Sequence, residues 1–299
     1  MTPLTPLSLP APAAVSLVSV FPSAANGGNP APIVLDADAM SHDEMRSVAA
    51  HYGHESAFVM APEHVGNAWR FRFFVPNHEM EMCGHATLGS LWVLRRAGRW
   101  DGEPVKIETL SGLVDGQLAA DGEHIEVSQP AGRTEPILDA SAIAAICATL
   151  RISPDDIAPE GICNAATSRV KTLVPLRSVA QLQALQPDFS TMLATCDAVA
   201  STGLYPCARD TAGDGKTLPV LQARQFPRSS GYPEDAATGI AAAALLYGAR
   251  RYGWLAPGER GVVVRQGVAM GHPSAITVTL RDPLDAAAGC WISGDVHAM

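Results

Sequence analysis

Two stretches of this chain share one order of elements: an extended segment, a polar turn and an apolar helix. In residues 71–94 (FRFFVPNHEMEMCGHATLGSLWVL) an alternating aromatic strand ends at Pro76, and an apolar run without proline follows the Cys-Gly-His turn. In residues 218–252 an extended segment ends at Pro227, and a second apolar helix follows the turn PEDAATG. A supersecondary unit that occurs twice predicts two pseudo-symmetric domains whose helix starts face one cleft.

The start of each apolar helix offers a place for an anion to bind. The first turn of a helix carries unpaired backbone N–H groups and a partial positive charge. In residues 71–94 that turn includes Gly84, where the missing side chain would let a ligand approach the backbone, and His85 stands beside it. The structural alternative for this triplet, taken alone, is a helix start with a buried Cys83 and a capping His85.

The composition indicates a well-filled core and argues against a nucleic-acid partner. The chain has 299 residues, of which 47% are hydrophobic and 17% charged, enough for one large domain or two of ordinary size. A formal charge of -9 and scattered arginines do not provide the concentrated basic surface that phosphate binding needs. Six cysteines lie far apart without a CxxC pair, so we expect reduced thiols in the cytoplasm and no metal site.

The apolar segments predict neither a secretion signal nor a membrane span. The N-terminus, MTPLTPLSLPAPAAVSLVSVF, lacks a basic leader and is interrupted by four prolines, which favours a loose tail. The alanine-rich run at residues 240–246 is far too short to cross a bilayer. We therefore expect no membrane partner.

Periodicity and turn residues place the remaining elements. In the first half we expect a helix that is capped by Ser41 and ends at Gly53, and strands at residues 15–21, 31–35, 71–75, 105–109, 112–118 and 124–127. In the second half we expect helices at 140–150, 178–185 and 240–252, and extended segments at 172–176, 198–202, 218–226, 262–265, 267–271 and 276–280. A break at residues 128–132 divides an N-terminal lobe (14–130, plus a returning strand at 288–299) from a C-terminal lobe (131–287).

Three ionisable residues stand at turns beside helix or strand starts: Glu55, His85 and Asp235. A carboxylate in an apolar pocket has a raised pKa, so it can take a proton from carbon and return it near neutral pH. Two helix N-termini would stabilise an enolate or carboxylate that develops. This chemistry needs no metal and no nucleotide cofactor, and no Walker-type loop, GxGxxG or HExxH motif occurs. Each carboxylate alone is more often a solvated turn residue, but the combination favours a catalytic site.

The order of these motifs resembles that of the phenazine-biosynthesis PhzF-like isomerase family. The resemblance rests on Gly28-Asn29-Pro30, Glu55-Ser56-Ala57-Phe58, Cys83-Gly84-His85-Ala86-Thr87, Glu234-Asp235 with Thr238-Gly239, and Gln266-Gly267 through Met270-Gly271 with Pro273-Ser274. It implies an α+β, diaminopimelate-epimerase-like fold. In that fold two similar domains each curl a mixed sheet around a central helix, the active site lies between them, and a homodimer is common.

The resemblance also implies roles for individual residues. The family's chemistry is a cofactor-free proton shift, in which dihydro-hydroxyanthranilate becomes its keto isomer. Glu55 would move the proton between carbons, while His85 and Asp235 would hydrogen-bond to amino or hydroxyl groups of the substrate. Backbone N–H groups of Gly84 and Gly239 would bind a carboxylate. The full set of expected substrate-binding residues is His54, Cys83, Gly84, Thr238, Gly239 and Ile240.

The chain departs from the family pattern at two of these positions and at Ala236. It has His54 where a small residue is usual, Ala236 where Pro is usual, and Ile240 where a Ser would supply a substrate hydrogen bond. The missing hydroxyl favours a substrate other than the phenazine precursor. Ala236 also occupies the position of the second thiol of two-cysteine epimerases, so we expect Cys83 to be a packing residue.

Three interpretations of the cleft follow. The first is an isomerase that acts through Glu55 on a small carboxylated, cyclic or amino-acid-like metabolite. The second is an epimerase that uses His54 or Cys83 as a second base. The third is a non-catalytic small-molecule-binding protein that keeps an inherited cleft, as His54 and Ile240 would permit.

Overall fold

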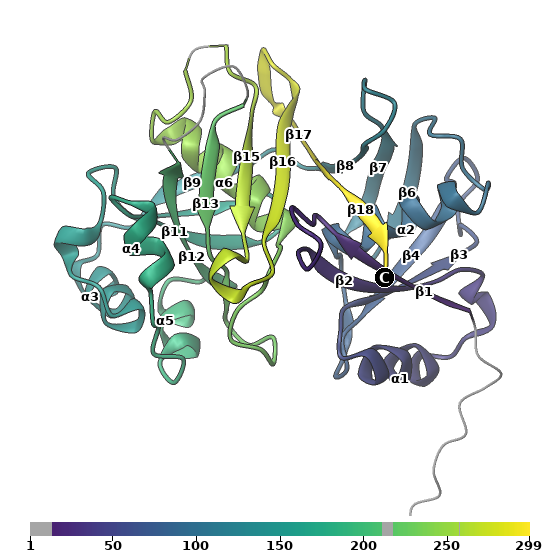
Figure 1. Ribbon diagram of the computed structural model, residues 1–299, viewed down its shortest axis with the longest axis horizontal. Coiled ribbons are helices and arrows are strands. Elements are labelled where there is room, and N and C mark those ends of the chain that lie inside the picture. Colours follow the sequence, from purple (N-terminus) through teal and green to yellow (C-terminus); the bar gives the residue numbers. More distant parts are fainter. Residues whose placement is uncertain (1–13, 211–217, 257) are drawn as a thin grey trace, which may run out of the picture.

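The computed structural model shows two lobes whose strands are linked into one hydrogen-bonded sheet system (Figure 1). It describes residues 14–210, 218–256 and 258–299. Most of the expected N-terminal tail lies outside these residues. No helix within the described ranges is long and apolar enough to cross a membrane.

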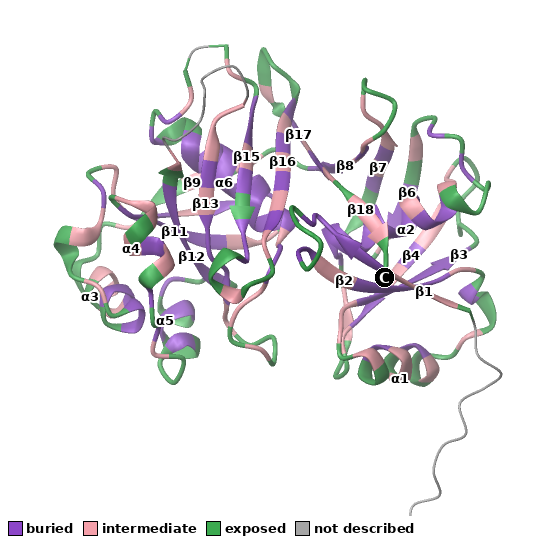
Figure 2. Cartoon of the chain, in the orientation of Figure 1, coloured by how far each residue is buried: buried purple, intermediate pink, exposed green. Residues whose placement is uncertain are grey.

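The N-terminal lobe curls its sheet around α2 (Gly84–Arg96), which packs against its first, second, third and last strands. The strands are β1 (Val15–Val20), β2 (Asn29–Val34), β3 (Ser56–Met60), β4 (Trp69–Phe74), β5 (Glu79–Met80), β6 (Val105–Thr109), β7 (Gly112–Leu118) and β8 (Ile125–Gln129). Nearly all of α2 is buried (Figure 2). A helix enclosed on all sides needs apolar residues all round, which is the pattern of this segment.

A second helix, α1 (His42–Tyr52), covers the outer face of the same sheet. It begins with the expected capping box between Ser41 and Glu44, and it ends at Gly53, which has a φ of 69°. Only one side of α1 is buried, because it lies on the surface of the lobe (Figure 2).

The C-terminal lobe repeats this arrangement around α6 (Gly239–Arg251), with three helices on its outer side (Figure 1). Those helices are α3 (Ala140–Leu150), α4 (Val179–Ala184) and α5 (Met192–Ala198). The strands are β9 (Arg133–Pro136), β10 (Cys163–Ala166), β11 (Val170–Pro175), β12 (Gly203–Asp210), β13 (Val220–Ala223), β14 (Phe226–Pro227), β15 (Gly261–Gln266), β16 (Ser274–Asp282) and β17 (Asp285–Gly294). The last strand of the chain, β18 (Val296–Ala298), returns to the N-terminal lobe.

Strand pairing shows that the two lobes have the same topology. In the N-terminal lobe seven strands pair in the order β1, β2, β3, β4, β6, β7 and β8. Along this series the β2–β3 and β4–β6 pairs are parallel, and the other four pairs are antiparallel. The pairs β10–β11, β11–β12, β12–β13, β13–β15, β15–β16 and β16–β17 have the same senses in the same order. In chain order, each central helix lies between the fourth and fifth strands of its series: α2 between β4 and β6, and α6 between β13 and β15. The predicted pseudo-symmetric α+β fold is confirmed.

The last strands connect the lobes. β17 pairs with β16 along one edge and with β8 along the other, and β18 pairs with β1. The side chain of Ile292 on β17 belongs to the core that surrounds both central helices. The end of the chain thus pairs with strands from the first half, while the lobe boundaries at residues 130 and 287 stay a prediction.

Two expected extended segments are wrong. Residues 198–202 are not a strand, because α5 ends at Ala198 and a turn follows, with Ala200 at a φ of 51° and the Ser201 hydroxyl donating to the carbonyl of Gly203. The strand of this region begins only at Gly203. Residues 267–271 hold a 3-10 helix, η3 (Val268–Met270), between glycines at φ of 74° and 75°.

Candidate active site

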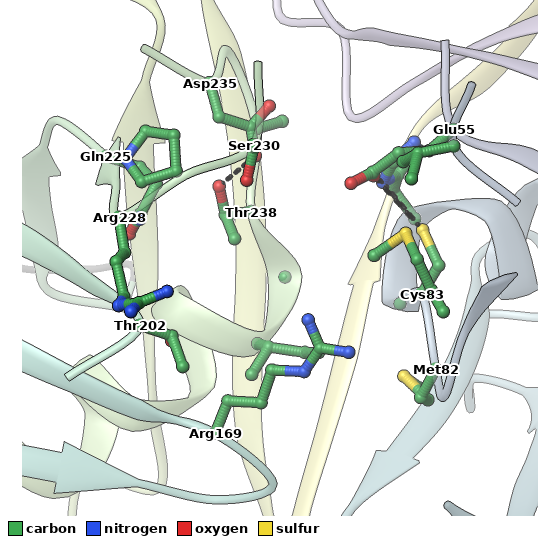
Figure 3. Close-up of a pocket in the computed structure, with 18 of the residues that line it drawn as sticks. Glu55, Met82, Cys83, Arg169, Thr202, Gln225, Arg228, Ser230, Asp235 and Thr238 are labelled. Atoms are coloured by element: carbon green, nitrogen blue, oxygen red, sulfur yellow. Dashed lines mark hydrogen bonds and ion pairs between the residues drawn. The ribbon is translucent and has the colours of Figure 1, made fainter. Parts of the chain in front are cut away.

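The two central helices begin at one cavity of about 260 Å³, which residues of both lobes line (Figure 3). The residues before the helices, Cys83 and Thr238, make no side-chain hydrogen bond that caps the helix start. The first N–H groups of α2 and α6 therefore remain available to a ligand. Such a paired arrangement suits a molecule that is anionic or becomes so during reaction.

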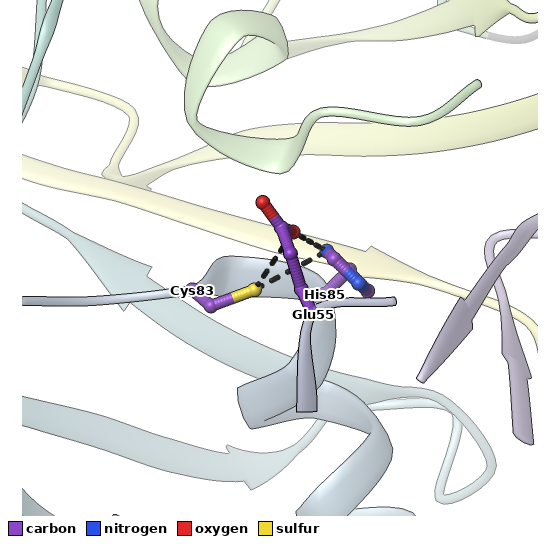
Figure 4. Close-up of side chains that lie close together, drawn as sticks. All are labelled: Glu55, Cys83 and His85. Carbon is purple, nitrogen blue, oxygen red and sulfur yellow. Dashed lines mark hydrogen bonds and ion pairs between the residues drawn. The ribbon is translucent and has the colours of Figure 1, made fainter. Parts of the chain in front are cut away.

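A triangle of ionisable side chains forms the N-terminal wall of the cavity (Figure 4). Glu55 immediately precedes β3, Cys83 precedes α2, and His85 lies in the first turn of α2. Glu55 Oε2 is 3.3 Å from His85 Nδ1 and 3.4 Å from Cys83 Sγ, and Sγ is 3.3 Å from Nδ1. The other carboxylate oxygen, Oε1, accepts a hydrogen bond of 3.3 Å from the Tyr232 hydroxyl, which comes from the opposite lobe.

Burial decides the ionisation of this triangle. It raises the pKa of Glu55, and the hydrogen bonds from Cys83 and Tyr232 oppose the rise only in part. Burial also lowers the pKa of His85 to about 4, so the imidazole is neutral near pH 7. The Cys83 pKa is raised well above its ordinary value by burial and then by the charge of Glu55, which keeps the sulfur as a thiol.

Asp235 stands on the opposite wall, in the turn before α6, and its contacts hold it in place. Asn29 Nδ2 donates to Oδ1 at 2.8 Å, and the Thr238 hydroxyl donates to Oδ2. Gln266 Nε2 donates to the Asp235 carbonyl at 2.7 Å and to Thr238 Oγ1 at 3.1 Å. Burial, followed by the charge of Glu55, raises the pKa of Asp235 to about 6.

The structure brings most of the expected site residues to this cavity. Those that line it are Glu55, Cys83, Gly84, His85, Asp235, Thr238, Gly239 and Ile240. His54 does not line it. It lines a neighbouring hollow beside Gly53 and His297, which Glu55 and Asp235 also reach.

A packing requirement applies to the glycines at the two helix starts. A Cβ on Gly84 would lie 2.9 Å from Ile292 Cδ1, and a Cβ on Gly239 would lie 2.8 Å from the same atom. The missing side chains thus make room for Ile292, which packs between the starts of α2 and α6. Gly84 and Gly239 also line the cavity, so the expected approach of a ligand to their backbone stays a prediction beside this packing requirement.

Several residues at the site are absent from the expected set. Asn29 and Gln266 do not line the cavity but hydrogen-bond to Asp235. Both lie in motifs that carry the family resemblance, but no role follows from those motifs alone. Tyr232, Arg169, Lys171 and Gln225 line the cavity. These four come from strand ends and loops without a local motif, so only the tertiary fold reveals them.

The Glu55, Cys83 and His85 triangle could also hold a metal ion, although the sequence predicts no metal site. Its three ligand atoms are 3.3–3.4 Å apart. Zinc bonds to sulfur, nitrogen and oxygen are ~2.0–2.3 Å long, and a tetrahedral arrangement of such bonds places neighbouring ligand atoms at about this spacing. A second group, Glu63, His64 and Glu108, offers suitable atoms at the surface, but Glu108 already accepts hydrogen bonds from the loop at residues 63–67.

A cavity between two pseudo-symmetric lobes, with an acid and an imidazole at paired helix starts, defines an epimerase-like isomerase. Within that class, the chain belongs to the PhzC-PhzF family of phenazine biosynthesis-like proteins, whose model matches residues 18–294. It is 31% identical to an uncharacterized isomerase of Deinococcus radiodurans over 278 residues, which cover 88% of this chain and 85% of that protein.

Two further comparisons agree. The chain is 28% identical over 283 residues to the trans-2,3-dihydro-3-hydroxyanthranilate isomerase of Pseudomonas chlororaphis, covering 93% of this chain and 94% of that protein. The crystal structure of the Bacillus anthracis phenazine biosynthesis protein of the PhzF family superposes with a TM-score of 0.81 at 25% identity, covering 95% and 96% of the two chains. The protein is therefore an isomerase, and the non-catalytic interpretation of the cleft is not supported.

Proposed function

We propose that this isomerase moves a proton between carbon atoms of a small carboxylated metabolite, with Glu55 as the acid and base. The observation that carries the proposal is the position of the Glu55 carboxylate. It lies in a cavity at the start of both central helices, and burial raises its pKa. A raised pKa brings a carboxylate closer to the range in which it can both accept and return a proton near neutral pH.

The reaction would begin with a carbon next to the substrate's carboxylate facing Glu55. The ionised Glu55 takes the proton from this carbon, and the protonated side chain then delivers it to a second carbon. The negative charge that develops on the substrate lies at the first N–H groups of α2 and α6, where the helix dipoles stabilise it. Hydrogen bonds from Cys83 and Tyr232 orient the two Glu55 oxygens throughout.

Asp235 and His85 would position the substrate. With a pKa of about 6, Asp235 is largely ionised above that pH and can accept hydrogen bonds from an amino or hydroxyl group. His85 Nδ1 already contacts Glu55 and Cys83, so a substrate hydrogen bond at this nitrogen would replace one of those contacts, and the neutral ring would add no charge to the cavity. These steps draw only on side chains and backbone groups of the protein, so we propose a cofactor-independent reaction.

Solvent deuterium exchange tests the role of Glu55. The trans-2,3-dihydro-3-hydroxyanthranilate named for the Pseudomonas chlororaphis relative, together with a panel of small amino and cyclic carboxylic acids, is incubated in heavy water and followed by proton NMR. Glu55→Gln should lower exchange by about 100-fold or more, since a positioned acid/base contributes that much. Glu135→Gln, at an exposed position on β9, should leave it unchanged. Exchange that persists in folded Glu55→Gln removes Glu55 from the mechanism.

An epimerase with Cys83 as second base is the alternative that one contact favours. The Cys83 sulfur lies in the cavity wall, 3.4 Å from the Glu55 carboxylate. This alternative predicts inverted configuration at the exchanged carbon and loss of that inversion in Cys83→Ser. Retained configuration in the wild-type product excludes it. His54, which lies outside the cavity, is a weaker candidate for a second base.

A further inference from the structure

The wall of the cavity that belongs to the C-terminal lobe contains a buried ammonium group. Lys171, on β11, has only 6% of its surface exposed and lines the cavity. Among the described residues, none forms a hydrogen bond or a close ion pair with its side chain. Asp235 and Glu55 attract it only from a greater distance, and burial lowers its pKa to about 8. A buried charge without a close partner is costly, so Lys171 calls for a ligand group that pairs with it.

Two further side chains on this wall also lack partners. Gln225 is 1% exposed, and within the described ranges neither its Oε1 nor its Nε2 has a hydrogen-bond partner. Arg169 precedes Lys171 by two residues and reaches into the space between the two walls (Figure 3). The described residues provide no ion pair for its guanidinium. Buried polar groups in proteins are nearly always hydrogen-bonded, so two buried donors without partners among the described residues, Lys171 and Gln225, indicate a ligand site, and the partly buried Arg169 adds a second cation to it.

The chemistry of this wall selects an oxyanion. An ammonium, a guanidinium and an amide N–H are all hydrogen-bond donors, and the planar guanidinium can donate two parallel hydrogen bonds to one carboxylate. A group with a single negative charge fits better than a doubly charged phosphate, because Glu55 and Asp235 line the same cavity and would repel the second charge. The cavity of about 260 Å³ restricts the whole ligand to a small metabolite.

We propose that the substrate is a small dicarboxylic acid, or an acidic amino acid, whose second carboxylate binds Lys171, Arg169 and Gln225. The first carboxylate then lies at the starts of α2 and α6, next to the carbon that reacts. This assignment of the reacting end rests on the proposed function. The binding of a second carboxylate rests only on the wall formed by Lys171, Arg169 and Gln225.

Calorimetric titration with two acids of equal carbon number tests this proposal. Glutarate carries two carboxylates and pentanoate carries one. Wild-type protein should bind glutarate at least 10-fold more tightly than pentanoate. Lys171→Met should reduce that ratio to about 1, while Lys106→Met, at an exposed position on β6, should leave it as in the wild type. Equal binding of the two acids by the wild type, no detectable binding of glutarate, or an unchanged ratio in Lys171→Met overturns the proposal.

Two more variants make the test robust. Removing an unpaired buried charge does not by itself destabilise a fold, so Lys171→Met should remain folded, which circular dichroism checks. If it does not fold, Arg169→Gln takes its place, since Arg169 is only partly buried and should still lose part of the glutarate preference. Glu55→Gln should keep the glutarate-to-pentanoate ratio while it loses deuterium exchange. A ratio near 1 in the wild type with exchange lost in Glu55→Gln would refute the second-carboxylate site alone. A high ratio with exchange retained would refute only the role of Glu55.

Discussion

Gly84→Ala should destabilise the protein through the side chain of Ile292. The new Cβ would lie 2.9 Å from Ile292 Cδ1, closer than carbon atoms normally approach. Cδ1 is the end of the Ile292 side chain and lies between the two helix starts, so a shift away from Gly84 moves it closer to Gly239. Overpacking of this kind costs ~1–3 kcal/mol. Replacing glycine in a helix recovers ~0.5–1 kcal/mol, so the expected net loss is between about 0 and 2.5 kcal/mol, with a midpoint of about 1 kcal/mol.

A double-mutant cycle isolates this contact. Ile292→Val removes Cδ1 at a cost of ~0.5–1.5 kcal/mol, and it also opens the space that the methyl group introduced by Gly84→Ala would occupy. The double variant Gly84→Ala/Ile292→Val should therefore be about as stable as Ile292→Val alone. Equilibrium unfolding in urea gives the four free energies. Independent substitutions add to within ~0.5 kcal/mol, so additive losses would refute the proposed packing at the two helix starts.

Gly248→Ala is the matched control for the cycle. It lies in α6, as Gly239 does, but its Cβ would meet Leu173 Cδ1 at 2.1 Å instead of Ile292. Gly248→Ala should destabilise the protein, and Ile292→Val should give it no relief. Gly239→Ala, by contrast, should show the same coupling to Ile292→Val as Gly84→Ala does. Relief of all three glycine variants by Ile292→Val would point to a general loosening of the core.

Two other predictions concern ionisation and metal binding at the cavity. Because burial and the charge of Glu55 raise the pKa of Asp235 from 3.8 to about 6, the folded chain holds this proton more tightly than the unfolded chain, and stability should fall as pH rises through that interval. Asp235→Asn should remove this fall. The free energy of unfolding of the variant minus that of the wild type should therefore be higher at pH 7 than at pH 4. An equal difference at both pH values would contradict a raised pKa for Asp235. Because Glu55, Cys83 and His85 have the spacing of zinc ligands, Zn²⁺ should inhibit deuterium exchange, and Co²⁺ should give a sulfur-to-metal absorption band that Cys83→Ser abolishes. Inhibition that is the same in Cys83→Ser would show that the metal binds elsewhere.

Local patterns were sufficient for the repeated unit and for five of the six described α-helices, while the family resemblance supplied the fold class and α5 was not predicted. The run after Cys83 and the run after Thr238 are apolar on every side, and both become helices enclosed by sheet. The capping box at Ser41 and the glycine at position 53 mark the ends of α1 as expected. These signals are read from neighbouring residues, since helix caps and periodicity depend on the chain within one or two turns.

The same local reasoning failed where two backbone conformations share one pattern. The segment at residues 198–202 is rich in small and β-branched residues that suit a strand, but Ala200 adopts a left-handed conformation in a turn. The sequence Gly-Val-Ala-Met-Gly at residues 267–271 likewise suits a strand. The backbone there bends at two glycines with φ of 74° and 75°, and it passes other backbone so closely that a Cβ on Gly267 would lie 2.2 Å from the carbonyl oxygen of His272.

By itself, the amino-acid sequence determined the repeated unit, its two enclosed helices and the acid, thiol and imidazole that motifs place near their starts. Only the tertiary structure decided that His54 lines a neighbouring hollow, that Ile292 packs against both glycines, and that Lys171 and Gln225 have no side-chain partner among the described residues. The reason is physical. Periodicity and capping act between residues close in the chain, whereas the pKa and the pairing of a buried group depend on strands and helices that only folding brings together.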